Sequence, residues 1–338
     1  MSKIMLAPME GVVDANMRDL LTGVGGIDTC VTEFIRVTSQ KLPVHDLLKK
    51  VPELARSGAT DSGVPVIVQF LGSDPDMLAY HSIEAAKLGA KGIDLNFGCP
   101  SKTVNKHRGG AVLLDEPETI YNIIKTVRDQ LSADIPLSAK MRLGNKDKTL
   151  ALENASAIES AGASSLVVHA RTKLEGYRAP AHWQWIRKIK DSIAIPVIAN
   201  GEVWSVYDYH KCREVSGCDD VMIGRGLLAD PSLALLIKHS VKVQELSGDG
   251  SSTEALEKEA ALAHTWHDTL LLLEKYYQRV QMQLPPPYVS GRLKQWLNMM
   301  RKHNHNAQDL FDKVKKITDL DELTSLLISE KANAASQR

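Results

Sequence analysis

Short apolar runs that end in Gly, Pro or polar residues recur eight times in the first two thirds of the chain. They are Ile4 to Pro8, Thr29 to Glu33, Pro65 to Phe70, Gly92 to Asn96, Leu137 to Arg142, Ser165 to His169, Pro196 to Asn200 and Asp220 to Ile223. Runs of this length predict buried strands. Helical periodicity fills most of the intervals, at 75–88, 117–131, 150–161 and 204–216. This alternation predicts parallel strands with crossover helices, and eight units indicate a (β/α)8 TIM barrel, an α/β fold.

A doubly wound sheet also alternates strands and helices, but it usually has fewer strands. It often carries a phosphate-binding glycine loop after the first strand. Here the first apolar run leads into Pro8-Met9-Glu10-Gly11 instead. We therefore favour a barrel, which we expect to occupy residues 1–244.

The pattern changes near residue 245. Residues 245–253 (ELSGDGSST) have the composition of a linker. Beyond them the periodicity predicts helices at 254–277, 291–302 and 306–329, with a break at the proline-rich segment 283–287. We expect a small all-α domain over 254–338, with a frayed tail from Lys331.

Charge and cysteine usage limit the possible partners. The chain has 41 Lys and Arg against 41 Asp and Glu, so a nucleic-acid-binding surface would have to be local. The four cysteines, Cys30, Cys99, Cys212 and Cys218, show neither metal-ligand nor disulfide-framework spacing. The N-terminal residues lack the features of an export signal, and no apolar run approaches membrane-spanning length. We expect a cytoplasmic monomer that uses neither membrane nor metal.

One cysteine follows a predicted strand directly. Cys99 lies on the Gly- and Pro-containing loop after Gly92 to Asn96. Catalytic groups of (β/α)8 barrels lie at the C-terminal ends of strands, and a thiol there can give or take a proton. An isolated cysteine is more often a small buried apolar side chain, so the neighbours of Cys99 must decide between the two interpretations.

Polar residues and glycines at the other strand ends have the chemistry of a cofactor site. Glycines after the seventh and eighth strands would let backbone N–H groups approach a phosphate, and an arginine there could add a charged hydrogen bond. A lysine can offset the negative charge of a reduced flavin, and a glutamine can both donate to and accept from a pyrimidine-like ring. Flavin mononucleotide (FMN) fits this set, which comprises Pro8, Met9, Gln69, Lys140, His169, Asn200, Gly201, Gly224 and Arg225.

Each of these residues has a structural explanation when it is taken alone, such as a turn glycine or a solvated strand end. Their joint placement at successive strand ends favours a site. A metal centre is the competing interpretation, but no pair of His, Asp or Glu shows ligand spacing along these strand ends.

Seven motifs together resemble the tRNA-dihydrouridine synthases. They are PMEGV (8–12), LNFGCPSK (95–102), GGA (109–111), AKMRLG (139–144), VHART (168–172), IANGE (198–202) and MIGRG (222–226). The resemblance spans the predicted barrel. The segments GYRA (176–179) and RLKQWL (292–297) and the short helical domain are most similar to the bacterial C-type branch, which modifies position 16 of tRNA.

This resemblance implies an activity and roles for individual residues. NADPH would reduce FMN, whose N5 would give a hydride to C6 of a D-loop uracil while Cys99 protonates C5, forming 5,6-dihydrouridine. The thiol should stay protonated for this task. Family analogy adds Glu202 to the cofactor-binding residues and implies that Asn96, Lys140, Arg142 and Tyr177 hold the base.

The segment 100–110 is basic, polar and glycine-rich. This composition suits a mobile flap that closes over Cys99 when RNA arrives, although an ordinary solvated loop has the same composition.

The predicted helical domain contains a local basic segment. Residues 275–316 hold nine Lys and Arg against two Asp, interleaved with Tyr276, Tyr277, Tyr288 and Trp296. Phosphate contacts and base stacking would use such a surface, and we expect Arg292 and Lys294 to contact tRNA. The alternative is a solvated helix face with its aromatic residues in the core.

Two other functions stay open at this point. A flavin-containing barrel of the dihydroorotate dehydrogenase kind could act on a free pyrimidine, and it would not need a basic helical domain. A non-catalytic RNA-binding protein could also use a barrel scaffold.

Overall fold

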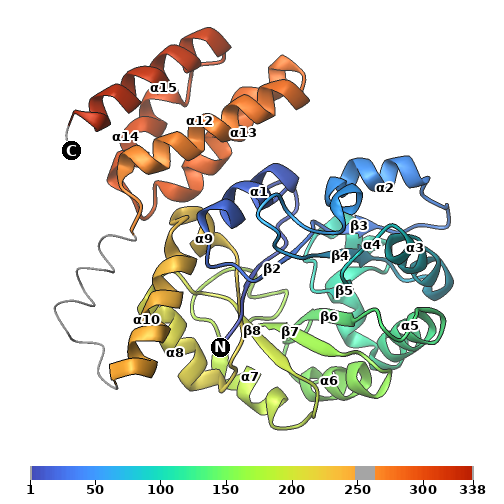
Figure 1. Cartoon of the computed structure of the whole chain (residues 1–338). Helices are drawn as coiled ribbons and strands as arrows, with labels where there is room; N and C mark the ends of the chain where they lie inside the picture. The colour runs from blue at the N-terminus through green and yellow to red at the C-terminus, as the bar shows by residue number, and fades with distance from the viewer. Residues whose placement is uncertain (1, 248–262, 337–338) are drawn as a thin grey trace. The chain divides into compact units, whose positions relative to one another are not determined.

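The computed structural model describes residues 2–247 and 263–336 (Figure 1). The chain forms two compact units. The barrel unit contains residues 1–15, 27–203 and 207–223, and the helical unit contains 16–26, 204–206 and 224–338. The helical unit thus includes most of α1 (Ala15–Val24), together with α9 (Arg225–Ala229) and α10 (Leu233–Ser247). The domain boundaries at 244, 245–253 and 254 stay a prediction. Residues 248–253 of that linker lie outside the described residues, and 245–247 belong to α10.

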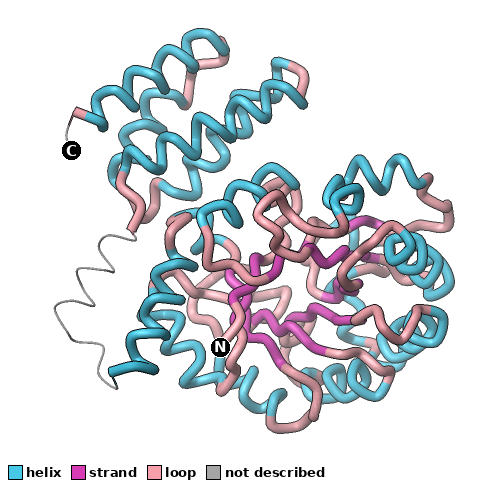
Figure 2. The backbone as a smooth tube through the Cα atoms, in the orientation of Figure 1, coloured by secondary structure: helices cyan, strands magenta, loops and turns pink. Residues whose placement is uncertain are grey.

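Within the described residues, nine strands form one sheet in which all neighbouring strands are parallel (Figure 2). The sheet order is β2-β1-β9-β8-β7-β6-β5-β4-β3, and β2 also pairs with β4. This pairing closes all strands except β3 into an eight-stranded barrel, so the predicted fold is confirmed. The strands are β1 (Ile4–Leu6), β2 (Thr29–Val31), β3 (Ile35–Arg36), β4 (Val66–Leu71), β5 (Ile93–Phe97), β6 (Leu137–Arg142), β7 (Ser165–His169), β8 (Val197–Asn200) and β9 (Val221–Ile223).

Strand β3 was not predicted, and β2 ends two residues before the predicted Glu33. Both strands pair with β4, so residues 32–34 interrupt what would otherwise be one strand. At the interruption, Thr32 N donates to Ile67 O at 3.0 Å, and Gln69 N donates to Thr32 Oγ1 at 3.0 Å. A side-chain oxygen thereby replaces a backbone acceptor, which satisfies the buried N–H of Gln69.

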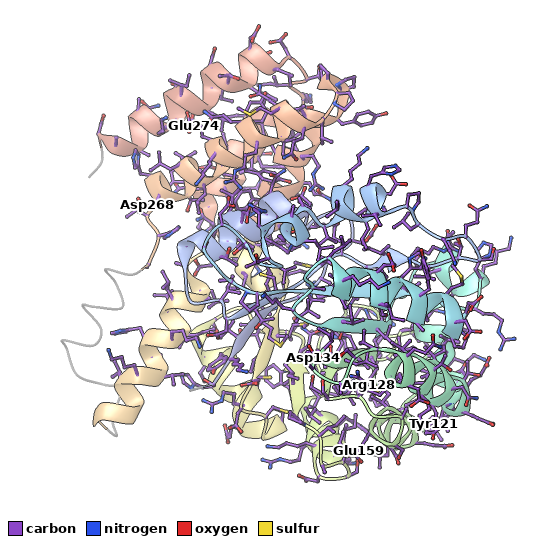
Figure 3. All side chains as sticks on the ribbon, turned by 45° about the vertical axis from the view of Figure 1, so that its right-hand side comes forward. Tyr121, Arg128, Asp134, Glu159, Asp268 and Glu274 are labelled. Carbon is purple, nitrogen blue, oxygen red and sulfur yellow. The ribbon has the colours of Figure 1, made fainter. Side chains whose placement is uncertain are left out.

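Helices surround the strands in Figures 1 and 2. Helix α5 shows why they form: Pro117 is its first residue, and Ile120, Ile123, Ile124 and Val127 make one buried stripe. In its last turn, Arg128 (Figure 3) donates to Leu131 O and Ile135 O, at 2.7 and 2.9 Å, which satisfies carbonyls beyond the helix end. The other helical segments of this unit are α2 (Val44–Lys50), η1 (Pro52–Arg56), α3 (Pro75–Lys87), α4 (Lys102–Lys106), η2 (Gly110–Asp115), α6 (Ala151–Ser160), α7 (Trp183–Lys190) and α8 (Val206–Ser216).

Apolar side chains from both sides of the barrel closure pack into one cluster. It comprises Ala7, Val31, Val167, Ile198 and Met222, with Met5 and Ile67 packed against it. Strands β4, β5 and β6 differ, because the lateral neighbours Gln69, Asp94 and Ser138 lie side by side and are polar. Both sets are buried or nearly so, which makes the polar set costly unless its hydrogen bonds are satisfied.

The C-terminal helices are α12 (Trp266–Gln283), α13 (Pro286–Met300), α14 (His305–Val314) and α15 (Leu320–Ala335). The predicted helix at 254–277 was placed wrongly: α12 begins where Thr265 and Asp268 (Figure 3) form a capping box, and residues 254–262 lie outside the described part. Helix α13 begins at Pro286 and not at Gly291, since proline is tolerated in a first turn.

The predicted single helix at 306–329 is wrong, because α14 and α15 are separate. Asp319 caps α15 by accepting from Glu322 N at 2.8 Å. The predicted fraying from Lys331 is also wrong as far as Ala335. Lys331 Nζ lies 2.6 Å from Glu274 Oε2 on α12 (Figure 3), and this ion pair helps to hold the last helix. No helix in the described part is long and apolar enough to cross a membrane.

Candidate active site

Strand register gathers the predicted site residues of the barrel unit. Arg142, His169 and Asn200 are successive lateral partners across β6, β7 and β8. Asn96 and Lys140 are partners across β5 and β6, as are Gln69 and Asp94 across β4 and β5. All except Asp94 lie in the C-terminal halves of parallel strands or at their ends, where barrel enzymes carry their chemistry.

The loop that carries Cys99 is held through its backbone. Asn96 Oδ1 accepts from Gly98 N at 2.9 Å and from Cys99 N at 3.0 Å. Cys99 O accepts from Asn105 Nδ2 at 3.0 Å and from Ala111 N at 3.1 Å. These four hydrogen bonds fix the position from which the thiol projects.

The Cys99 side chain is largely buried, with 9% of the residue exposed. It packs with Leu71, Val104 and Phe34. Burial raises the pKa of the Cys99 thiol, and the nearby Glu10 carboxylate raises it further. The Ser101 N–H and the Arg142 guanidinium only partly offset this rise in pKa. The thiol is therefore protonated at neutral pH and suits the role of a proton donor.

The segment after Cys99 is more ordered than expected. Residues 102–106 form the short helix α4, and Val104 on this helix is buried. Asn105 Nδ2 also donates to Gly109 O at 2.9 Å, which ties the far end of the segment to α4. An ordinary solvated loop does not describe residues 102–106, because a buried apolar residue and a bridging amide stabilise this helical turn, and closure of the segment over Cys99 stays a prediction.

Lys140 has a charge but no protein partner. No described residue lies within hydrogen-bond or ion-pair distance of its Nζ. Burial lowers the pKa of Lys140 to about 8, and the Arg142 guanidinium contributes to the lowering, while Asp94 opposes it. An ammonium group in this setting is suited to an anionic ligand.

Arg142 joins two loops. Its Nε donates to Gly98 O at 2.8 Å, next to Cys99. Its Nη1 donates to Thr172 O at 3.2 Å and to Gly176 O at 2.9 Å, and its guanidinium lies 5.1 Å from the centre of the Tyr177 ring. The predicted base-binding arginine thus also supports the segment that carries the predicted base-binding tyrosine.

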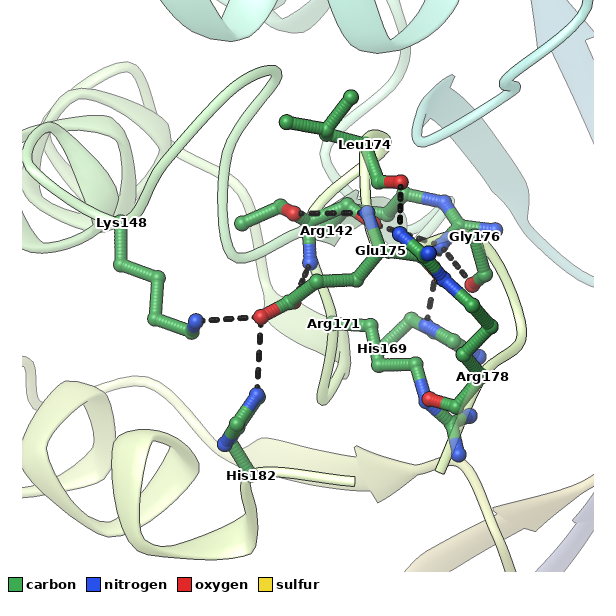
Figure 4. A network of polar contacts seen from close by, with 10 residues as sticks. Arg142, Lys148, His169, Arg171, Leu174, Glu175, Gly176, Arg178 and His182 are labelled. Carbon is green, nitrogen blue, oxygen red and sulfur yellow. Dashed lines mark hydrogen bonds and ion pairs between the residues drawn. The ribbon is translucent and has the colours of Figure 1, made fainter. Parts of the chain in front are cut away.

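Glu175 is the centre of that second loop, as Figure 4 shows. Its Oε1 accepts from Lys148 Nζ at 2.6 Å and from His182 Nε2 at 2.9 Å, and its Oε2 accepts from Thr172 N at 2.6 Å. Burial opposes ionisation, but these donors outweigh it and lower the pKa of Glu175 to about 2. The anchored loop presents Tyr177, which is 56% exposed and lies edge-on to His169 at 5.9 Å.

Two consecutive residues with positive φ follow β8. Gly201 has φ +117° and Glu202 has φ +62°, a conformation in which a non-glycine residue is strained. Glu202 forms an ion pair with the fully buried Arg171, whose Nε donates to Arg178 O at 2.6 Å. Arg171 Nη1 is buried with no partner among the described residues. Asn200 Nδ2, at the end of β8, donates to Met222 O at 2.8 Å.

Pro8 and Met9 are half-buried and follow β1 after Ala7, and Met9 O accepts from Val12 N at 3.0 Å and Val13 N at 2.9 Å. Gly224 and Arg225 belong to the helical unit. Gly224 caps the short α9, and the Arg225 guanidinium lies 4.8 Å from the centre of the Trp204 ring.

In the helical unit, the four aromatic residues of the basic segment differ in solvent exposure. Trp296 is 1% exposed and donates its Nε1 proton to Leu228 O at 3.0 Å, and Tyr276 and Tyr277 are buried too. Tyr288 is 67% exposed. The interpretation of all four as a stacking surface is wrong for the three core residues, because their side chains fill the interior of the helical unit.

The predicted RNA-contacting residues are half-buried. Lys294 Nζ donates to Ile317 O at 2.5 Å, and Arg292 Nη1 donates to Gln295 Oε1 at 2.8 Å. Three other lysines of the same basic segment are exposed, and no described residue forms a hydrogen bond or ion pair with their side chains: Lys275, Lys302 and Lys316.

Sequence reasoning missed several residues that shape the site, namely Asp94, Asn105, Ser138 and Glu175, whereas Arg171 lies in the VHART motif already singled out. Their signals were weak, because a polar residue inside an apolar strand run was the only mark of Asp94 and Ser138. No group of three or more potential metal ligands occurs among the described residues.

A parallel barrel with a buried, protonated thiol and an unpartnered lysine at its strand ends defines a (β/α)8-barrel enzyme. Residues 5–327 match the protein family described as dihydrouridine synthase (Dus). The chain belongs to this family of oxidoreductases.

Relatives match almost the whole chain. A tRNA-dihydrouridine(16) synthase of Neisseria meningitidis serogroup B is 50% identical over 326 residues, which cover 96% of this chain and 94% of the relative. The protein of the same name from Pseudomonas putida is 48% identical over 325 residues, 96% of each chain. That from Ralstonia nicotianae is 45% identical and covers 97% of this chain and 95% of its own.

Proposed function

We propose that this protein reduces a uridine in the D-loop of tRNA, at position 16, to 5,6-dihydrouridine, with FMN as cofactor and NADPH as reductant. The observation that carries the proposal is the buried Cys99 side chain two residues after β5, on a loop whose backbone is held by four hydrogen bonds, together with the burial that raises the pKa of its thiol. The relatives named tRNA-dihydrouridine(16) synthase support the substrate and the position. A tRNA substrate would place the activity in the cytoplasm.

The residues fit a planar, anionic cofactor. The unpartnered Lys140 ammonium and the buried Arg171 Nη1 are donors without acceptors, and Gly201 and Glu202 turn the backbone through positive φ. We assign FMN binding to Pro8, Met9, Gln69, Lys140, His169, Asn200, Gly201, Glu202, Gly224 and Arg225. When bound and reduced, FMN supplies the hydride for the 5,6 double bond of uracil.

The chain supplies the proton and the orientation of the base. Cys99 Sγ–H donates to C5, and the raised pKa keeps that proton in place until it is needed. Asn96, Arg142 and the exposed Tyr177 bind and orient the uracil. Because a stacked or paired uracil is inaccessible, the enzyme must take an unpaired or extruded nucleotide, at a cost of about a few kcal/mol.

The activity test uses the purified full-length protein. We expect it to bind FMN, to have its flavin absorption bleached by NADPH, and to convert position 16 of tRNA, as mapped by mass spectrometry. NADH, assayed in parallel, tests the choice of reductant. Reduction of free uridine as fast as tRNA would instead favour an enzyme for free pyrimidines, and absence of bound flavin would favour a non-catalytic RNA-binding protein.

We assign tRNA binding to the helical unit, with Arg292, Lys294 and the exposed lysines as phosphate contacts. Each lost contact should lower the salt dependence of binding by about 0.7 to 0.9 in log Kobs against log salt. Lys302→Glu and Lys316→Glu test this without disturbing internal hydrogen bonds. Lys294→Glu also removes the bond to Ile317 O, so its melting temperature must be measured too.

The matched control for tRNA binding is Lys91→Glu. Lys91 is exposed and immediately precedes the buried Gly92 and strand β5, at the N-terminal end of the barrel. That end of a barrel does not carry the active site. Equal effects of Lys91→Glu and Lys302→Glu would show that overall charge, and not a contact, governs binding.

A further inference from the structure

We propose that Asp94 is a positioning residue for Cys99, and that it acts through the side-chain amides of Gln69 and Asn96. The inference rests on the function proposed above. Asp94 is 1% exposed, and its side chain accepts hydrogen bonds from Gln69 and Ser138. It therefore acts on the reaction through other residues and not by contact with substrate.

A continuous series of hydrogen bonds joins Asp94 to the Cys99 loop. Gln69 Nε2 donates to Asp94 Oδ2 at 2.7 Å, and Asn96 Nδ2 donates to Gln69 Oε1 at 2.8 Å. Asn96 Oδ1 then accepts from Gly98 N and Cys99 N. Asp94 and Gln69 are lateral partners in register, so the series begins between adjacent strands of the barrel wall.

The chemistry of the groups fixes the direction of every bond in this series. The N–H groups of Gly98 and Cys99 can only donate, so Asn96 must turn its oxygen toward them. Its NH2 group then faces Gln69, which must present its oxygen there. The NH2 group of Gln69 consequently faces residue 94, which must be an acceptor. A carboxyl group fulfils this requirement, because it can present an acceptor oxygen to Gln69 whether or not it is ionised.

The second oxygen of Asp94 is held separately. Ser138 Oγ donates to Asp94 Oδ1 at 2.6 Å, and Ser138 is the lateral partner of Asp94 on β6. Asp94 is therefore anchored on one side and directs the amides on the other. If the acceptor were lost, the Gln69 amide could reverse, the Asn96 amide could follow, and the loop would lose both hydrogen bonds to its N–H groups.

A positioning role predicts a different result from a purely structural one. A structural role would lower thermal stability and affect every step in proportion to the fraction of folded protein. A positioning role would slow the transfer to uracil, leave the flavin reduction by NADPH nearly unchanged, and tolerate any side chain that keeps an acceptor toward Gln69.

The test compares three variants of the FMN-loaded full-length protein by stopped-flow spectroscopy. In Asp94→Ala, we expect uridine reduction to slow by about 10- to 100-fold, with the KM for tRNA and the rate of flavin reduction within about threefold of wild type. In Asp94→Asn, the carboxamide oxygen can still accept from Gln69, so uridine reduction should recover to within about fivefold. Ser138→Ala removes the bond to the other oxygen and should reduce the rate by no more than about threefold.

Asp94→Leu, which fills the volume of the carboxylate without an acceptor, replaces Asp94→Ala if the alanine variant does not fold. Three results would overturn the inference: rates within threefold of wild type for both acceptor-free variants, equal losses in Ser138→Ala and Asp94→Ala, or an asparagine variant as slow as the alanine one. Failure of the proposed function is separable, because wild-type protein would then not reduce tRNA uridine at all.

Discussion

The interior of the barrel has a polar side and an apolar side. On β4, β5 and β6, the side chains of Gln69, Asp94 and Ser138 form a hydrogen-bonded row. On β7, β8 and β9, the side chains of Val167, Ile198 and Met222 pack in an apolar cluster. The polar side orients side-chain amides toward the candidate site, and the apolar side stabilises the folded barrel through burial. The two sides should therefore respond differently to mutation: activity on one, stability on the other.

The largest effect is expected for Cys99→Ala. Loss of a positioned proton donor should slow formation of dihydrouridine by about 10²- to 10⁴-fold, while flavin binding and reduction by NADPH persist. Mass-spectrometric quantification of tRNA turnover checks this. Cys212→Ala is the control, because burial raises the pKa of Cys212 to about 12 and this thiol lies in α8. Near-normal product from the Cys99 variant would remove this residue from the mechanism.

On the apolar side, Met222→Ala should lower the free energy of unfolding by about 2 to 5 kcal/mol, because it leaves a cavity in a fully buried cluster. Turnover per folded molecule should change little. Urea unfolding at fixed pH measures the loss. Met282→Ala makes the same chemical change at a residue that is 85% exposed, and it should stay within about 0.5 kcal/mol of wild type. A large loss of turnover per folded molecule in Met222→Ala would contradict the assignment of the apolar side to stability alone.

Arg142→Lys should affect both activity and stability. A single ammonium cannot reproduce the guanidinium fork that contacts the Gly98, Thr172 and Gly176 carbonyls. We expect a loss of about 1.5 to 3 kcal/mol in the free energy of unfolding, from hydrogen bonds to a charged group, together with slower turnover. Thermal unfolding and steady-state kinetics on one preparation test this. Unchanged unfolding with slower turnover would assign Arg142 to substrate binding alone.

The smallest expected effect concerns pH. Burial lowers the pKa of Lys140 from 10.5 to about 8, so its positive charge is present below pH 8 and lost above it. If that charge supports the reaction, turnover should fall to about one tenth for each pH unit above the pKa of Lys140 in the FMN-loaded enzyme, which the anionic cofactor shifts upward from 8. Lys140→Met should be slow throughout and lack this decline. A Lys140→Met variant that turns over as fast as wild type at neutral pH would separate Lys140 from the reaction.

The same group gives a stability test with a defined sign. Between about pH 8 and pH 10.5, the unfolded chain retains a proton that the folded chain has released at Lys140, so the free energy of unfolding rises with pH in this window. Cofactor-free wild type should therefore gain stability relative to Lys140→Met across that range. An opposite slope would mean that Lys140 has an anionic partner in the folded protein.

The sequence was informative wherever a local signal sufficed. Strands β6 and β7 have the predicted bounds, because their apolar runs end abruptly in arginine and histidine. The break before α15 also had a local signal that was overlooked, since Asp319 is followed three residues later by Glu322, the spacing of a capping box. Helix α4 had no such signal, because five polar-rich residues are too few to show a period.

Other features depend on register and packing, which local patterns do not contain. Asp94 and Ser138 are neighbours only because β5 and β6 pair at that residue. Trp296 and Tyr277 occur among basic residues in the sequence, yet their rings are in the core of the helical unit. Which face of an amphipathic helix is buried depends on the neighbouring helices, so composition could not separate these rings from Tyr288.

Gly110 has φ +67°, and a Cβ at this residue would come within 2.8 Å of Cys99 O. The close approach of residue 110 to the backbone of Cys99 is thus possible only because glycine has a hydrogen atom in place of a side chain. Even alanine at 110 would have to displace the backbone of the loop. Substitutions that shift the position of the Cys99 thiol should therefore be tolerated among its apolar neighbours but not at this residue. Backbone spacing, and not side-chain identity, sets the limit on how far this loop can be redesigned.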